Sequence, residues 1–230
     1  MTPLSFLQIL PGLRKADTID RMSEYATFAA LSAAEKENKD FRVRIAGRNS
    51  STVIVAPHGG GIEPGTSEIV EAIAGPDLSF ADFAGIKSKG NEILHITSTH
   101  FDEPRCTALV KAAEHVIAVH GEDSEEPVVY LGGKDFELRA RVRKVLVNAG
   151  FTVKEHPNRK LHGLDKRNIC NRNKKKAGVQ LELSRGQREK FFQSLNAAGR
   201  KHPKPELIEF ANAVRKGLGA GELPNPSAGR

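Results

Sequence analysis

A histidine and a glutamate flank a run of glycines in the segment APHGGGIEPG, residues 56–65. His58 precedes the three glycines and Glu63 follows them, and imidazole nitrogens and carboxylate oxygens are both good zinc ligands. The glycines allow a turn tight enough for both side chains to point at one spot. The alternative is a glycine loop that binds phosphate, but the Gly-Lys-Ser/Thr ending of such loops is missing. We therefore favour a metal site in this segment.

A further histidine ends an apolar run and precedes a glycine. His120 follows residues 116–119, which are all apolar. If this strand runs parallel to the one before His58, both imidazoles emerge at the carboxyl edge of one sheet, where open α/β sheets bind ligands. Histidines at strand ends are also common on protein surfaces, so His120 is a candidate metal ligand mainly because of its pairing with the first motif.

Two more histidines lie in the segment HITSTHFDE, residues 95–103. We treat His100 as a rival third metal ligand or as a contact for substrate. Asp102 and Glu103 are better explained as the first residues of a helix, because negative charge is favourable near a helix N-terminus.

A glutamate lies between two leucines in the segment QLELSR, residues 180–185. This residue, Glu182, faces either solvent or a functional cleft. A glutamate that is partly desolvated near a metal can have a pKa suited to a general base. The residue pattern alone leaves both interpretations open.

Residues 134–176 are strongly basic. They include 14 Lys or Arg and 4 Asp or Glu, a charge of +10, whereas the whole chain carries +7 (35 minus 28). Such a concentration favours an anionic partner, which could be nucleic acid, an acidic polymer or an anionic membrane face. Three polar residues of this segment are candidates for gripping substrate carboxylates by their chemistry alone. They are Arg167, Asn171 and Arg172.

The elements that must position these residues alternate between strands and helices. This order predicts an α/β fold with a mixed parallel and antiparallel sheet flanked by helices. Strands are expected at residues 41–46, 52–56, 92–97, 115–119, 127–131, 151–155 and 179–183. Helices are expected at residues 20–36, 66–74, 103–113, 134–148, 186–198 and 205–218. The short acidic link between the strands at 115 and 127 favours antiparallel pairing of these two.

The 230 residues are 39% hydrophobic and 27% charged, which is typical of a globular protein rather than a disordered or membrane protein. We expect one catalytic domain over residues 20–218, with an N-terminal leader at 1–19 and a flexible tail at 219–230. Neither a signal peptide nor a membrane-spanning run is recognisable, so we expect a protein that is cytoplasmic when made. The two cysteines, Cys106 and Cys170, are then expected to stay reduced.

Taken together, these motifs resemble the phage-type poly-γ-glutamate hydrolases. The resemblance rests on residues 56–68, 94–102, 119–121, 131–135, 168–172 and 178–185, and it spans roughly residues 20–215. It implies a fold like that of the zinc carboxypeptidases, one zinc held by His58, Glu63 and His120, and Glu182 as the catalytic glutamate. The His-x4-Glu spacing is longer than the His-x2-Glu usual in carboxypeptidases, so the first loop is longer here.

The resemblance implies a zinc hydrolase that cleaves γ-glutamyl amide bonds of poly-γ-glutamate, an anionic polymer that the basic segment suits. One alternative is a zinc deacylase or carboxypeptidase that acts on small acylated amino acids. A different class of alternative is a basic phage protein that binds nucleic acid, although aromatic residues for base stacking are scarce in the basic segment. We expect a monomer without membrane binding and, for a phage-encoded protein, release by host lysis.

Overall fold

Seven strands form one mixed sheet in the computed structural model, which describes residues 25–224. Their order across the sheet is β1-β3-β2-β4-β7-β5-β6. Neighbouring strands run parallel except for β1 against β3 and β5 against β7. The predicted α/β class with a mixed sheet is therefore confirmed. The strands are β1 (Phe41–Ala46), β2 (Thr52–Gly60), β3 (Ser79–Gly85), β4 (His115–Glu122), β5 (Val129–Gly132), β6 (Val153–Lys154) and β7 (Val179–Ser184).

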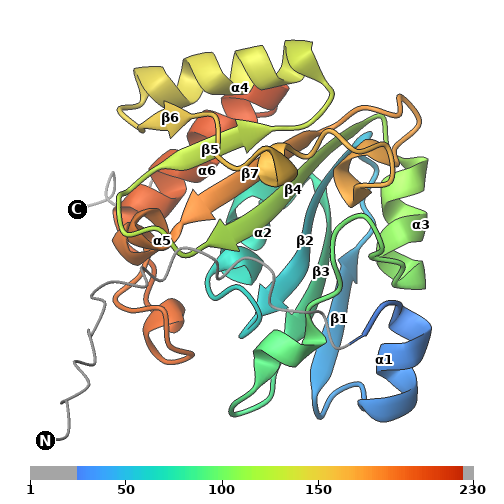
Figure 1. The fold of residues 1–230 in the computed structure, drawn as a ribbon. Coiled ribbons are helices and arrows are strands. Elements are labelled where there is room, and N and C mark those ends of the chain that lie inside the picture. The colour runs from blue at the N-terminus through green and yellow to red at the C-terminus, as the bar shows by residue number, and fades with distance from the viewer. Residues whose placement is uncertain (1–24, 225–230) are drawn as a thin grey trace, which may run out of the picture.

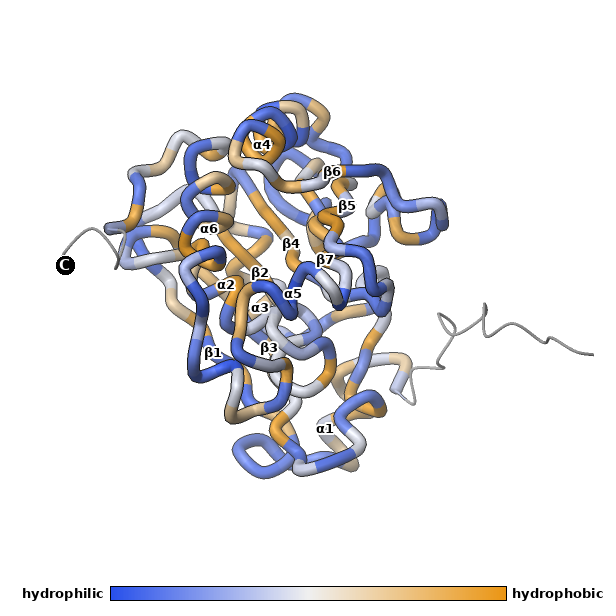
Figure 2. Tube along the Cα trace, turned by 90° about the vertical axis from the view of Figure 1, so that its left-hand side faces the viewer, coloured by the Kyte–Doolittle hydropathy of each residue, from blue (hydrophilic) through white to orange (hydrophobic). Residues whose placement is uncertain are grey.

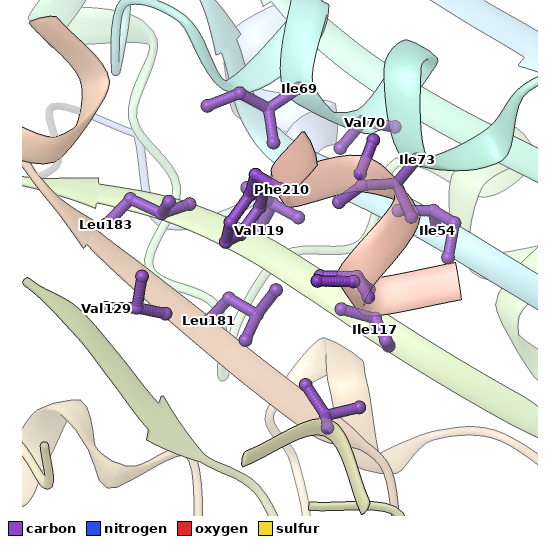
Figure 3. Packing of buried hydrophobic residues seen from close by; sticks show 14 of the residues in the cluster. Ile54, Ile69, Val70, Ile73, Ile117, Val119, Val129, Leu181, Leu183 and Phe210 are labelled. Atoms are coloured by element: carbon purple, nitrogen blue, oxygen red, sulfur yellow. The ribbon is translucent and has the colours of Figure 1, made fainter. Parts of the chain in front are cut away.

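Helices cover both faces of this sheet (Figure 1). On one face, side chains such as Ile54, Val119 and Leu181 pack against α2, α4, α5 and α6. Figure 3 shows this cluster with Ile69 of α2 and Phe210 of α6. On the other face, alternate residues such as Val55 and Ala118 pack against α1 and α3. The helices are α1 (Phe28–Ala34), α2 (Thr66–Ala74), α3 (Pro104–Ala112), α4 (Phe136–Asn148), α5 (Arg185–Phe191) and α6 (Pro205–Leu218).

The central strands β2 and β7 are covered on both faces. Every residue of β2 and β7 is buried, which is the pattern of strands covered on both faces. Figure 2 shows these hydrophobic segments in the interior, with hydrophilic residues concentrated on the outer turns. A polar residue on such a strand is shielded from solvent, and this is the setting of His58, His120 and Glu182.

The expected pairing of the strands at 115 and 127 is wrong. β7 lies between β4 and β5 and pairs with both, parallel to β4 and antiparallel to β5. The physical reason is burial: β7 is apolar on one face and carries Gln180 and Glu182 on the other, so it needs a neighbour on each side and cannot serve as an edge strand.

Two strand assignments also differ. The strand expected at residues 92–97 is a 3₁₀ helix, Asn91–Leu94, preceded by Gly90 with a left-handed φ of 74°. The sequence analysis did not predict β3, whose SFADFAG sequence mixes weak strand formers with a buried aspartate. That aspartate, Asp82, is completely buried and pairs with Arg44 of β1 at 2.8 Å.

The expected helices at 66–74 and 205–218 match α2 and α6, whereas two others are shorter than expected. The helix predicted at 186–198 ends at Phe191, because Phe192 is extended and forms a β-bridge with Pro203. Of the helix predicted at 20–36, residues 28–34 are helical, and its start lies outside the described residues, as do the predicted leader and residues 225–230. Between residues 25 and 224, no helix has the length and apolarity needed to cross a bilayer.

Candidate metal centre

A β-bulge near the carboxyl end of β2 sets the direction of His58. Ala56 pairs with Asp82 on β3, and Gly59 pairs with Ala84, so β2 uses one more residue than β3 between these two pairs. Without the bulge, alternation would send His58 to the same face as Ala56, against α2. Bulges commonly re-aim a side chain next to a functional site, and this one turns the imidazole toward the α3 face.

Three donor groups converge on that face of the sheet. Nδ1 of His58 lies 2.9 Å from Oε1 of Glu63 and 3.2 Å from Nδ1 of His120. The same nitrogen of His120 lies 3.6 Å from Oε2 of Glu63. Within residues 25–224, this is the group of three potential metal-binding side chains whose ligand atoms all come close together.

Backbone and hydroxyl groups orient the two imidazoles. Nε2 of His58 lies 2.7 Å from the carbonyl oxygen of Ile96, which can accept a hydrogen bond but cannot donate one. Nε2 therefore carries the proton, and Nδ1 is left as the bare nitrogen facing Glu63 and His120. Metal-binding histidines usually donate their other ring N–H in this way, which fixes the tautomer and the ring orientation. Nε2 of His120 lies 3.4 Å from Oγ of Ser98.

The spacing and chemistry of the three donors fit zinc. Zinc bonds of about 2.0–2.1 Å in a tetrahedral arrangement place neighbouring ligand atoms roughly 3.3 Å apart. The two separations from Nδ1 of His58, 2.9 Å to Oε1 of Glu63 and 3.2 Å to Nδ1 of His120, lie near this value. Nδ1 of His120 lies 3.6 Å from the other carboxylate oxygen of Glu63, Oε2. Two imidazole nitrogens and a carboxylate are also electron-rich groups, and a cation between them would stabilise their close approach. Two histidines and one glutamate leave a fourth position open, as in catalytic zinc sites.

Glu63 is held in place from several sides. The amide of Gly121 donates to its Oε2 at 2.8 Å, and the hydroxyl of Thr66 donates to its carbonyl oxygen at 2.9 Å. Burial alone raises the pKa of Glu63, but His58 and His120 lower it by more, so the net shift is well below the usual range. The carboxylate is therefore ionised at neutral pH, which is the form that binds a metal.

A buried hydrogen-bond network supports the glycine turn between His58 and Glu63. Oγ of Ser67 accepts from the amide of Gly60 at 2.7 Å and donates to Oδ1 of Asp82 at 2.8 Å. A Cβ on Gly59 would lie 1.9 Å from the same carboxylate oxygen. The glycine run therefore lets the turn lie directly on the side chains of β3 and α2, and glycine is required at this point of closest approach.

Glu182 lies beside this cluster on β7. It is paired in register with His120 on the neighbouring parallel strand, so both side chains project from the same face of the sheet. Its Oε1 accepts from Nε2 of Gln180 at 2.8 Å, and the oxygen of Gln180 accepts from Nδ2 of Asn168 at 2.8 Å. Burial, and after it the nearby Glu63, raises the pKa of Glu182 well above its usual range.

His95, rather than His100, lies against the cluster. The ring of His95 stacks on that of His58 with centroids 3.9 Å apart, and its Nε2 lies 3.8 Å from Glu63. Burial and the nearby His58 lower the pKa of His95 to about 3, so this imidazole is neutral at pH 7. His100 is exposed and is not one of the three clustered donors. The sequence contained a usable signal in the two histidines of residues 95–103, but spacing alone did not distinguish them.

The three candidates from the basic segment have different roles in the fold. The amide nitrogen of Asn171 donates to the carbonyls of Gly163 and Asp165, and its oxygen accepts from two backbone amides. Arg172 donates to the carbonyls of four residues, which anchors the loop: Arg167, Phe101, Ser98 and Thr99. The side chain of Arg167 is 61% exposed and pairs with Asp165. Of these three residues, only Arg167 could therefore bind a ligand without giving up hydrogen bonds that hold the loop together.

The family model of the poly-gamma-glutamate hydrolases matches residues 25–213. The chain belongs to the poly-gamma-glutamate hydrolase family. One relative, YmaC of Bacillus subtilis (strain 168), is 34% identical to this chain over 91% of this chain and 90% of its own length. YndL of the same strain is 37% identical over 73% of this chain, and the matched part is 66% of YndL.

Two solved structures have the same fold as this chain. A bacteriophage poly-gamma-glutamate hydrolase superposes with a TM-score of 0.82 at 31% identity, covering 86% of this chain and 97% of that one. YndL in an apo, zinc-free form superposes with a TM-score of 0.81 at 33% identity, covering 87% and 100%. The predicted family and fold are thus confirmed, whereas the predicted roles of individual site residues stay predictions.

Proposed function

We propose that this chain is a zinc hydrolase that cleaves the γ-glutamyl amide bonds of poly-γ-glutamate. One observation carries the proposal: the donor atoms of His58, Glu63 and His120 meet beside the buried carboxylate of Glu182 on the adjoining strand. Family membership supports the substrate class. The description of the YndL structure as zinc-free supports zinc rather than another metal.

The chain's own residues supply the acid–base chemistry. Zinc held by three protein ligands lowers the pKa of a water molecule and polarises a carbonyl group. Because Oε1 of Glu182 is engaged by Gln180, Oε2 is the oxygen that accepts a proton from the attacking water. Glu182 then delivers a proton to the nitrogen of the leaving amine.

Two further groups are placed to contact the substrate. His95 is 32% exposed beside the cluster, and a neutral imidazole there can donate an N–H to the oxygen that becomes negative during attack. Along the polymer, each γ-glutamyl unit carries one carboxylate, and the +10 charge of residues 134–176 favours its capture. Of the three candidates from the basic segment, we retain Arg167 as a contact for the polymer. Its guanidinium is exposed, and exposed ion pairs such as its pair with Asp165 exchange readily with other partners.

The decisive experiment is Glu182→Gln, assayed on poly-γ-glutamate with chain length read by size-exclusion chromatography. The amide keeps the shape and can still accept from Gln180, but it cannot accept the proton. We expect turnover to fall by about 10²- to 10⁴-fold while zinc content stays at that of the parent protein. The exposed Glu209→Gln serves as the matched control and should retain full turnover.

Turnover of Glu182→Gln within about threefold of the parent would contradict the role of general base. Loss of zinc in this variant would make Glu182 a ligand instead. Cleavage of small acylated amino acids without cleavage of the polymer would favour the deacylase alternative. Tight, salt-sensitive binding of duplex DNA without any hydrolysis would favour the nucleic-acid alternative.

A further inference from the structure

A deeply buried arginine joins three chain segments next to the candidate centre. Arg188 of α5 is 2% exposed, and its guanidinium donates to three backbone carbonyls. Nε donates to Leu183 at 3.2 Å, Nη1 to Pro64 at 2.7 Å and Nη2 to Glu122 at 2.7 Å. One side chain therefore connects the loop after β2 with the carboxyl ends of β4 and β7.

Each of these carbonyls lies one or two residues from a side chain of the candidate centre. The pairs of carbonyl and functional residue are Pro64 with Glu63, Glu122 with His120, and Leu183 with Glu182. The ladder between β4 and β7 already sets the spacing of two of these segments, because it pairs Gly121 with Leu183. The loop after β2 lies beyond the last pair of β2 with β4, at Val55, so this ladder does not hold it. The arginine is the group that contacts all three at once.

The backbone of Gly121 lies between this guanidinium and the carboxylate of Glu63. Its amide donates to Oε2 of Glu63 at 2.8 Å. A Cβ at this position would lie 2.6 Å from Cζ of Arg188, so a side chain would displace the guanidinium. The absence of a side chain at Gly121 therefore allows the arginine to approach the strand end directly.

Arg188 is buried without a carboxylate partner. It forms no ion pair with any residue of the described range 25–224, whereas Arg215, also 2% exposed, pairs with Asp77 at 2.7 Å. Burial lowers the pKa of Arg188, and the nearby carboxylates of Glu63, Asp123 and Glu122 oppose this shift without reversing it. Burying a charge without a paired counter-charge costs free energy, so stability alone is a poor explanation for this arginine.

We propose that Arg188 is a positioning residue of the metal centre, which holds the segments carrying Glu63, His120 and Glu182 at the spacing that the centre requires. The proposal rests on the function proposed above, because it takes these side chains as the ligands and the base. The planar guanidinium is essential: lysine keeps the charge but has a single nitrogen on a flexible stem and cannot reproduce the three-way geometry.

The test compares Arg188→Lys with Arg215→Lys. Both changes replace a buried arginine that binds backbone carbonyls, but Arg215 holds Ile73 and Ala74 of α2, away from the centre. Zinc affinity is measured by chelator competition, and exchange of the Gly121 amide is measured in metal-free protein. For Arg188→Lys we expect zinc binding at least tenfold weaker and Gly121 exchange at least tenfold faster. For Arg215→Lys we expect a lower Tm but zinc affinity within twofold of the parent and unchanged Gly121 exchange.

Equal zinc affinity and equal Gly121 exchange in the two variants would overturn the proposal. Should Arg188→Lys fail to fold, Gly121→Ala takes its place, since it keeps the arginine but crowds the guanidinium, and weaker zinc binding is again expected. If the parent protein binds no zinc, the proposed function fails. The exchange comparison then still decides whether Arg188 organises this region.

Discussion

Glu182 is predicted to destabilise the metal-free protein at neutral pH, so that Glu182→Gln is more stable than the parent while being less active. The side chain is 5% exposed, makes no ion pair within residues 25–224, and has one hydrogen bond from Gln180. Burial and Glu63 raise its pKa well above the usual range. In the unfolded chain the same carboxyl group ionises near its ordinary pKa of about 4.3.

The sign of the pH dependence follows from these two pKa values. Because the folded state holds the proton more tightly, the stability that Glu182 contributes is complete below about pH 4.3 and is lost as pH rises through the folded pKa. Each unit of difference in pKa corresponds to about 1.4 kcal/mol of unfolding free energy once the group is ionised. In a chain of this size that amounts to a change in Tm of about 3–6 °C per unit.

The assay is thermal unfolding of chelator-treated protein between pH 4 and pH 8. Glutamine mimics the neutral carboxyl group, so the Tm of Glu182→Gln should exceed that of the parent by an amount that grows with pH. The exposed Glu209→Gln provides the control and should follow the parent at every pH. Parallel curves for Glu182→Gln and the parent would refute the reasoning, because they would show that the buried carboxylate carries no penalty.

Three further predictions concern the centre, the basic segment and the glycine turn. Elemental analysis should find about one zinc per chain. His58→Ala and His120→Ala should each lose this zinc, whereas His100→Ala should keep it. Zinc kept in His120→Ala but lost in His100→Ala would show that His100, not His120, is the third ligand. Cleavage of the polymer should weaken steeply with salt, since exposed charges are screened within about 8 Å at physiological ionic strength, whereas cleavage of a short uncharged γ-amide should change little. Gly59→Ala should lower stability by about 1–3 kcal/mol in a denaturant titration, because its Cβ would lie 1.9 Å from a buried carboxylate oxygen of β3. Gly221→Ala, with no atom within 4 Å of the new Cβ, should be nearly neutral.

The sequence supported the fold class and most of the elements because apolar runs and caps are local signals. The strand at 41–46 and the helices at 66–74 and 205–218 were predicted at their observed bounds, whereas the strand expected at 52–56 continues to Gly60. Strand pairing is not local, and the hairpin between β4 and β5 was predicted wrongly for that reason. β3 was missed because Asp82 interrupts its apolar pattern, and its burial depends on Arg44 from another strand.

For the candidate centre, residue chemistry and strand ends pointed to His58, Glu63 and His120 but left His100 as a rival, and the full set was implied only by the family resemblance. The geometry that brings the three donors together was not visible in the sequence. The bulge that reverses the direction of His58 appears in the sequence only as a proline and glycines near a strand end. His95 and His100 are equivalent by type, and only the path of the loop after residue 90 places one of them against His58. Residue type identified possible ligands, and backbone irregularity decided which of them meet.

The same distinction explains why Arg188 could not be identified beforehand. In the sequence it is one of several basic residues in a short, charged helix, where a solvent-exposed arginine is the ordinary expectation. Its position in the structure depends on three carbonyls from separate segments and on the missing side chain of Gly121. Candidate metal ligands can be inferred from their chemistry, but a group that binds the backbone leaves no comparable pattern of residue types.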